Sequence, residues 1–168
     1  QNNNTNYSSP IQISGAGWSK SHCGYFETLS IKNDNTLWAW GLNDKGQLGQ
    51  NNNTNYSSPV QVPGTTWRSL SGNHKQYVAT KTDGTLWVWG RNEIGVLGLN
   101  QQGNSISSPT QIPGTTWMNI TAISNQTLLA TKTDNTLWAW GYNNVGELGV
   151  NSRTSYSSPI QIPGSTWK

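Results

Sequence analysis

The sequence predicts an all-β fold in which a repeat of about 50 residues forms the blades of a β-propeller. Trp-x-Trp-Gly occurs three times, at residues 38–41, 87–90 and 138–141. Ser-Ser-Pro-x-Gln occurs four times, with its proline at positions 10, 59, 109 and 159, so successive copies are 49 or 50 residues apart. No segment has helical periodicity, whereas four short strand-like segments fall within each period. This pattern is typical of propeller blades.

The first two strand-like segments of each period form a predicted hairpin. In the first copy, residues 28–32 alternate polar and apolar side chains, which is the period of a β-strand. Asn33-Asp34-Asn35 follows, and Asn or Gly after Asp suits a tight turn because both residues tolerate positive φ. Residues 36–40 are mainly β-branched and aromatic, which favours a second strand.

Both faces of this second strand are predicted to be covered. Thr36, Trp38 and Trp40 fall on one face and Leu37 and Ala39 on the other, because successive side chains of a strand alternate. The Trp-x-Trp pairs could form a stacking platform for sugars or bases, but their presence in all three copies and their apolar surroundings favour packing between adjacent blades. The residues assigned this structural role are Trp18, Trp38, Trp40, Gly41, Trp67, Trp87, Trp89, Gly90, Trp117, Trp138, Trp140, Gly141 and Trp167.

The rest of each period is predicted to consist of loops and two further strands. Residues 41–49 contain recurring glycines and indicate an ordered loop. The Asn- and Ser-rich residues 50–58 could be a low-complexity linker, but their fixed place in the repeat favours a structured surface loop. Residues 59–62 then form a short edge strand that starts at a proline, and residues 65–70 form the fourth strand.

The composition indicates a packed, Trp-rich domain rather than a disordered chain. Hydrophobic residues make up 32% and charged residues 10%, below the usual ~45–50% and ~25%. Ten tryptophans offset this deficit, and the net charge is only +3, whereas disorder pairs low hydrophobicity with high net charge. We treat residues 1–168 as a single repeat domain, with units at approximately 1–49, 50–99 and 100–150 and a partial unit at 151–168.

Charge pattern and cysteine content argue against several functional classes. The ten Lys and Arg residues are scattered singly, whereas an electrostatic nucleic-acid footprint requires clustering, so we expect no nucleic-acid partner. Cys23 is the only cysteine, which excludes an intrachain disulfide and a multi-cysteine zinc site. No apolar run approaches the ~18 residues of a membrane span.

No pattern in the sequence predicts catalysis, a cofactor or a metal site. Asn43-Asp44-Lys45-Gly46 has oxygen donors like those of a cation loop, but its counterparts in the other two copies change or lose the acid, which favours a glycine turn. His22, His74 and Cys23 are the only side chains whose reference titration lies near neutrality, and they offer no nucleophile–base constellation. We therefore predict that the protein is not an enzyme.

The stretch from Asp83 to Gly98, DGTLWVWGRNEIGVLG, resembles the signature of the regulator-of-chromosome-condensation repeat family. The Ser-Ser-Pro-x-Gln segment and the Trp that follows it resemble the other half of that repeat, so the resemblance extends over the whole chain. It implies β-propeller blades of four antiparallel strands, usually seven to a ring. The family pattern places a histidine where this chain has Glu27.

The number of copies implies an incomplete ring. Three complete periods and a partial fourth leave sheet faces and edges uncovered, which invites association. We expect the chain to be a segment of a longer propeller, with completion of the ring by oligomerisation as the alternative. The expected partners are accordingly other protein chains, including further propeller repeats or copies of this chain.

Function is expected on the rim loops, where the repeats diverge. These loops are polar and nearly uncharged, and neutral loops that carry Tyr and Asn suit adaptable protein or glycan contacts. The candidate interaction residues are Tyr7, Asn53, Tyr56, Asn104, Ile106, Arg153 and Tyr156.

The leading hypothesis is a non-enzymatic interaction or structural module on a virion or extracellular surface, because few charges and Asn, Ser and Thr richness resemble prokaryotic and phage members of the family. A glycan-binding adhesin is the first alternative. The second is the nucleotide-exchange or chromatin-associated role of the eukaryotic namesake, which would need a strongly charged partner face that these loops lack.

Overall fold

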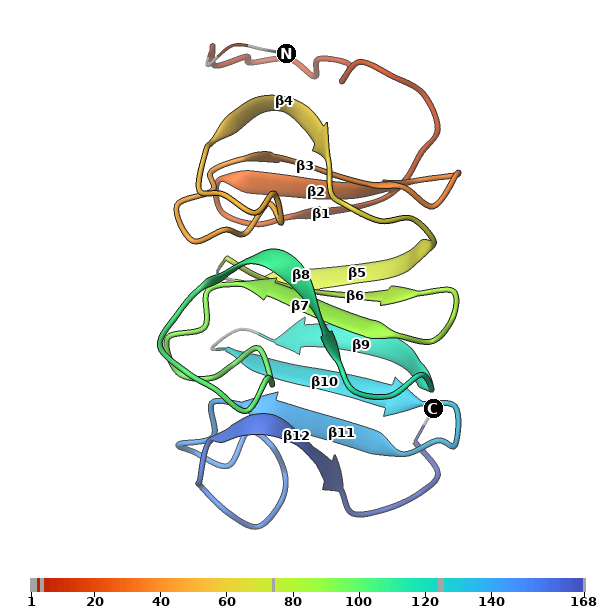
Figure 1. Cartoon of the computed structure of the whole chain (residues 1–168), viewed down its shortest axis with the longest axis vertical. Helices are drawn as coiled ribbons and strands as arrows, with labels where there is room; N and C mark the ends of the chain where they lie inside the picture. The colour runs from red at the N-terminus through yellow and green to blue at the C-terminus, as the bar shows by residue number, and fades with distance from the viewer. Residues whose placement is uncertain (1–2, 4, 74, 124–125, 168) are drawn as a thin grey trace.

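The computed structural model describes residues 3, 5–73, 75–123 and 126–167, and these residues form twelve β-strands and no helix. Figure 1 labels the strands and colours them by residue number. Their bounds are β1 (Trp18–Cys23), β2 (Glu27–Lys32), β3 (Leu37–Gly41), β4 (Tyr56–Gln61), β5 (Trp67–Asn73), β6 (Gln76–Lys81), β7 (Leu86–Gly90), β8 (Ile106–Ile112), β9 (Trp117–Ile123), β10 (Thr127–Lys132), β11 (Leu137–Gly141) and β12 (Tyr156–Ile162).

The strands form three antiparallel sheets of four, each in chain order. We call them blade 1 (β1–β4), blade 2 (β5–β8) and blade 3 (β9–β12). Figure 1 shows the blades stacked along the longest axis of the molecule, in an open array with blade 1 at one end and blade 3 at the other. The first strands β1, β5 and β9 contact one another across the blades, so they form the inner edge of the array. This arrangement confirms the predicted all-β propeller blades.

The apolar core lies between the blades. One cluster joins aliphatic side chains of blade 1, such as Leu29 and Leu37, to Trp67 and Trp89 of blade 2. A second cluster repeats this packing one blade further on, between the aliphatic face of blade 2 and the Trp face of blade 3. Each blade therefore presents aliphatic residues to the next blade and tryptophans to the preceding one.

The hairpins match the sequence prediction. β2 and β3 pair directly, with Ser30 opposite Trp38, and the same register recurs in the other blades. The turn position after Asp has positive φ in each copy: 62° at Asn35, 78° at Gly84 and 62° at Asn135. Asn and Gly adopt this conformation at little cost, which explains why these residues stand there.

Two strand assignments from the sequence are wrong. The segment that begins at Trp67 is not the fourth strand of its own repeat, because Trp67 pairs with Lys81 and β5 therefore opens the next blade. The fourth strand instead begins at Tyr56, before Pro59, so the loop assigned up to residue 58 is shorter than expected. Sheets consequently span 18–61, 67–112 and 117–162, out of phase with the sequence units.

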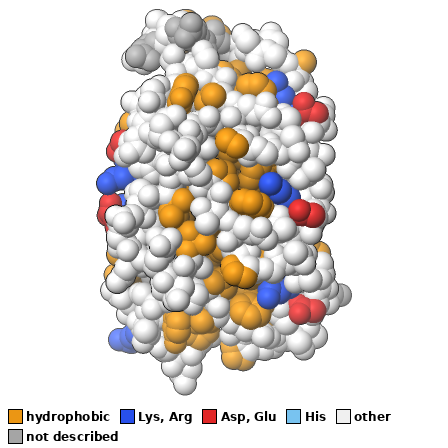
Figure 2. All heavy atoms as spheres, viewed as in Figure 1, with side chains coloured by type: hydrophobic (Ala, Val, Ile, Leu, Met, Phe, Trp, Pro, Cys, Tyr) orange, Lys and Arg blue, Asp and Glu red, His pale blue; other side chains and the backbone are white. Residues whose placement is uncertain are grey.

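The surface repeats as regularly as the core. Figure 2 shows basic and acidic side chains next to one another at three heights along one edge, with hydrophobic side chains exposed between the blades. Within the described part of the chain, no helix is long and apolar enough to cross a membrane.

Candidate functional site

Each hairpin turn is braced by a chain of side-chain hydrogen bonds. In blade 1, the Trp38 indole donates to the Thr36 hydroxyl (2.9 Å), and that hydroxyl donates to the Asp34 carboxylate (2.6 Å). The Thr36 backbone N–H donates to the same carboxylate oxygen at 3.0 Å. Blades 2 and 3 repeat all three bonds. The hydrogen bonds from Thr36 hold the pKa of Asp34 below its ordinary value, and Asp83 and Asp134 are shifted in the same direction by the same cause.

A lysine lies between two tryptophans in each blade. The Lys81 ammonium is 4.7 Å from the Trp67 ring centroid and 4.2 Å from that of Trp87. Lys32 and Lys132 make the equivalent pairs of contacts. A cation over an indole face is stabilised by the ring quadrupole, so these lysines hold the Trp pairs. Sequence reasoning missed this role, although the signal was present as a Lys two residues before every hairpin Asp.

The asparagine after each Trp-x-Trp-Gly is fully buried and ties two loop segments together. In blade 2, Asn92 accepts a hydrogen bond from the Leu97 backbone N–H (3.0 Å) and donates to the Gln101 carbonyl (3.1 Å). Asn43 and Asn143 make the corresponding bonds in their own loops. The amide oxygen and the amide nitrogen of each of these asparagines are therefore both hydrogen-bonded within the fold. This favours the glycine-turn interpretation of Asn43–Gly46 over a cation loop.

Glycine follows each Trp pair because no side chain fits there. Gly41, Gly90 and Gly141 have φ of 106°, 97° and 104°. A Cβ at Gly90 would lie 2.0 Å from the carbonyl oxygen of Lys75, and the other two glycines meet the equivalent carbonyl. Both the positive φ and this close approach require glycine.

Glu27, which stands where the family pattern has histidine, forms a polar contact between blades. Its side chain is 3% exposed and accepts a hydrogen bond from the Tyr77 hydroxyl at 3.0 Å. Burial, followed by the nearby Glu27 charge and this hydrogen bond, raises the pKa of Tyr77. The pair therefore links blade 1 to blade 2. His22 packs edge-on against Tyr77, and His74 lies outside the described residues.

The structure separates the candidate interaction residues into two groups. Asn53, Asn104 and Arg153 are exposed in the long loops between the third and fourth strands, as expected. Tyr56, Ile106 and Tyr156 are not loop residues, because each begins a fourth strand and is half-buried. Tyr56 and Ile106 pack against the two core clusters, so part of their area is used within the fold.

Tyr7 stands apart from both groups. It precedes the first strand, is 49% exposed, and its hydroxyl accepts a hydrogen bond from Asn3 at 3.1 Å. Asn52 donates an equivalent hydrogen bond to the Tyr56 hydroxyl (3.2 Å). The N-terminal segment therefore folds locally like the loop of blade 1.

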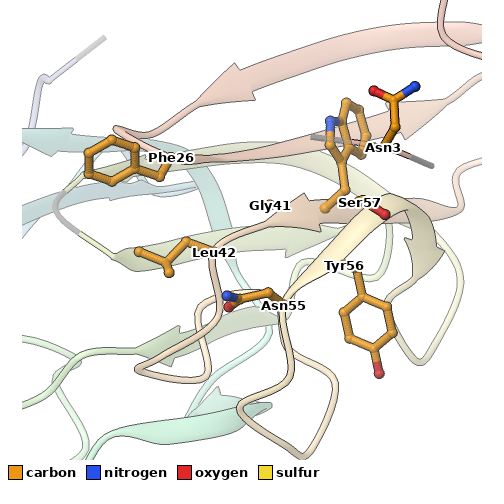
Figure 3. Close-up of a pocket in the computed structure, with 8 residues that line it drawn as sticks. Asn3, Phe26, Gly41, Leu42, Asn55, Tyr56 and Ser57 are labelled. Atoms are coloured by element: carbon orange, nitrogen blue, oxygen red, sulfur yellow. The ribbon is translucent and has the colours of Figure 1, made fainter. Parts of the chain in front are cut away.

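Exposed aromatic side chains gather at one end of the array. Tyr25 and Phe26, in the β1–β2 loop, are 69% and 73% exposed. Phe26 borders a cavity of about 480 Å³, shown in Figure 3, together with Trp40, Gly41, Leu42, Asn55, Tyr56, Ser57 and Asn3. Sequence reasoning missed these two aromatics, because the other repeats have no matching pair to draw attention to them.

The described residues contain no group of three or more His, Cys, Asp or Glu side chains that could hold a metal ion. The three Asp residues of the hairpin turns are engaged by Thr, and Cys23 is an exposed free thiol. The exposed features are polar loops and uncovered blade faces, which suit binding to another macromolecule.

Known structures similar to the three blades include a human and a yeast protein. Human WBSCR16 aligns with a TM-score of 0.79 and 18% identity, over 91% of this chain and 39% of that one. Prp20p from Saccharomyces cerevisiae aligns with a TM-score of 0.77 and 18% identity, over 89% of this chain and 39% of that one. This chain thus spans about two fifths of their length. At 18% sequence identity, this structural similarity establishes a shared fold and nothing more.

The family itself is shown by sequence. No curated protein sequence gives a significant match. The family model for the regulator of chromosome condensation (RCC1) repeat, however, matches residues 34–79, 83–124 and 134–167, which is most of the chain. The chain therefore belongs to the RCC1 repeat family, as three successive blades of its propeller.

Proposed function

We propose that this protein is a non-enzymatic interaction module that binds other protein chains through its long loops, on a virion or extracellular surface. The proposal rests on one observation: the polar residues that recur in every copy are engaged in interactions within the fold. The Asp, Thr, Lys and Asn found in every copy brace turns, tryptophans or loops. Exposed polar side chains that differ between copies remain on the long loops, which lie together on one side of the array in Figure 1.

The binding partners of structurally similar proteins support the proposal that this chain binds protein. Prp20p binds Gsp1p and histones, and another structure holds it bound to Kap60. Those partners belong to the yeast protein. For this chain, the shared fold supports the general class of protein binding. An exchange or chromatin role is the less favoured version, because the loops carry no strongly charged face.

Photo-crosslinking in the native host tests the loop assignment. A benzophenone amino acid is placed singly at Asn53, Asn104 and Arg153, and at Thr65 and Thr115, which are exposed in the connections between blades. We expect specific crosslinks to protein from the loop positions and none from the two threonines. Crosslinks from the threonines alone would refute the loop assignment. Antibody labelling of intact particles or unpermeabilised cells tests the surface location.

A glycan-binding adhesin is the second candidate, favoured by the cavity in Figure 3. Phe26 and Trp40 provide aromatic surface there, and Asn3 and Asn55 provide amides. Flat apolar faces beside amide groups suit a sugar ring. A glycan array in which the intact chain binds no glycan would exclude this candidate.

A further inference from the structure

The glycine-rich loop of blade 1, residues 41–49, packs against blade 2. The Trp89 indole of blade 2 donates a hydrogen bond to the Gln47 carbonyl of that loop at 2.9 Å. Gly46 lies so close to blade 2 that an added Cβ would be 2.5 Å from Ser107. The Asn51 N–H donates to the Ser107 carbonyl at 2.8 Å. The loop of blade 1 therefore packs into a site formed by the second Trp and the fourth strand of blade 2. We call this site the seat.

Blade 2 is seated on blade 3 in the same way. A Cβ at Gly95 would meet Ser157 at 2.6 Å, and one at Gly98 would meet the Trp140 indole at 2.6 Å. The Asn100 N–H donates to the Ser157 carbonyl at 2.7 Å. The two consecutive interfaces share the close glycine approach and the Asn N–H bond to the fourth-strand Ser, whereas the Trp140 indole N–H, unlike that of Trp89, has no hydrogen-bond partner. The shared contacts define what a matching surface must contain.

The two ends of the array carry the separated halves of this interface. In blade 3, the equivalent glycines Gly146 and Gly149 have no atom within 4 Å of an added Cβ. In blade 1, the equivalent seat is the cavity of about 480 Å³ in Figure 3, whose lining includes Trp40 and Ser57. Trp40 corresponds to Trp89, and Ser57 corresponds to Ser107. The uncovered loop and the Trp40 cavity, which Asn3 of the N-terminal segment also lines, lie at opposite ends of the array.

Among the described residues, the two most exposed large hydrophobic side chains lie at the same two ends. Phe26 is 73% exposed and Val145 is 80% exposed. Phe26 occupies the position of Lys75, which pairs with Asp44 across the first interface (2.6 Å). Val145 occupies the position of Lys45, which pairs with Glu93 across that interface (3.3 Å). Both apolar side chains therefore stand where interior blades make contact.

We infer that copies of this chain associate end to end, with the loop of residues 143–149 of one copy seated in the Trp40 cavity of the next. Val145 of the first copy then lies near Asp44 of the second, as Lys45 lies near Glu93 within the chain. Ser57 already makes an interaction within this chain, and in the contact its carbonyl also accepts from the Asn151 N–H, as Ser107 accepts from Asn51. The contact excludes Asn53 and Asn104, but it adjoins Arg153, which lines a hollow with Gly146 and Asn151, and it uses the cavity named for the glycan candidate. A repeated head-to-tail contact of this kind gives a ring if it closes and a filament if it does not.

Short terminal segments must move aside for this contact. Residues 7–13 have the same sequence as β12, YSSPIQI, which would occupy their place from the neighbouring copy. Trp167 donates its N–H to the Asn135 carbonyl at 3.1 Å, as Trp67 does to Asn35 at 2.9 Å, and thus holds the place of the neighbour's Trp18. Trp167 is 40% exposed, whereas the equivalent Trp67 and Trp117 are 0% and 2% exposed, so its release costs less apolar burial than theirs would.

Sedimentation velocity of the intact chain over a range of concentrations tests the inference. We expect the mass to rise from 18.4 kDa in multiples of that value. Val145→Lys should restore the cross-interface ion pair with Asp44 and tighten association about two- to fivefold, whereas Val145→Glu should weaken it by a similar factor. The matched changes Thr65→Lys and Thr65→Glu, in the connection between blades 1 and 2, should alter neither.

A glycine pair gives the steric test. Gly146→Asn would place a side chain in the contact and should weaken association at least tenfold. Gly103→Asn is its control, because Gly103 also has positive φ and open space but lies in the loop of the middle blade. A mass of 18.4 kDa at every concentration overturns the inference, as does equal weakening by both glycine variants. The exposed Val145 variants keep the test decisive if Gly146→Asn fails to fold.

Discussion

At the residue scale, the repeated polar side chains build the blades. Sequence alone identified Asp34 and its equivalents as turn residues, because Asp before Asn or Gly is a local signal. It could not show that Thr36 and Trp38 extend that turn into a hydrogen-bonded chain. Nor could it show that Lys81 lies between two indoles, since that contact joins residues from three strands. Local chemistry was predictable and side-chain partners were not.

The buried asparagines provide the first residue-scale prediction. Asn92→Ala leaves the buried Leu97 N–H and the Gln101 carbonyl without this partner. Leaving a buried polar group unsatisfied costs about 1–3 kcal/mol, so we expect the free energy of unfolding to fall by at least that amount in urea denaturation. Asn104→Ala, an exposed control, should stay within about 0.5 kcal/mol of the original. Equal losses for both variants would contradict the bracing role.

The hairpin aspartates make stability depend on acid pH. Their folded pKa values are lowered by hydrogen bonds from Thr, so the carboxylates contribute stability above the unfolded pKa, about 3.9. That contribution is lost as pH falls through the folded values. We therefore expect the thermal midpoint to fall below about pH 4, and less steeply in the triple variant with Asn at residues 34, 83 and 134. Identical profiles for both proteins would exclude these carboxylates as the cause.

At the element scale, strand existence was easier to predict than strand partnership. The β2–β3 hairpin was correct because its pairing is closed by a short turn. The strand at Trp67 was assigned to the wrong blade, since it has a possible partner on either side in sequence and only tertiary packing selects Lys81. Tyr56 was placed in a loop because its polar neighbours conceal a strand whose inner face packs on the core.

The blade interface gives the element-scale prediction. Trp89→Phe removes the indole that donates to Gln47 and leaves a smaller ring in a fully buried site. The unpaired carbonyl and the void together should lower unfolding free energy by about 2–4 kcal/mol in chemical denaturation. Trp40→Phe is the matched control, because the equivalent Trp40 is only half-buried at the end of the array and should cost less than about 1 kcal/mol. A larger loss for Trp40→Phe would contradict the assignment of the covered and open faces.

At the scale of the whole molecule, three blades leave two complementary ends. The count of copies in the sequence predicted incompleteness. The features that make the ends complementary, the open space at Gly146 and Gly149 and the cavity beside Trp40, needed the structure. The sequence could not show them because the same residues are covered in the interior blades.

The most direct test of this account is amide hydrogen exchange at three equivalent positions, Asn51, Asn100 and Asn151. The first two amides donate to Ser107 and Ser157 across the blade interfaces. We predict that both are protected at every concentration, and that Asn151 exchanges rapidly in dilute solution but becomes protected as concentration rises. Protection of Asn51 and Asn100 with rapid exchange at Asn151 in concentrated solution would contradict the claim that the ends of the array are matching halves of one interface.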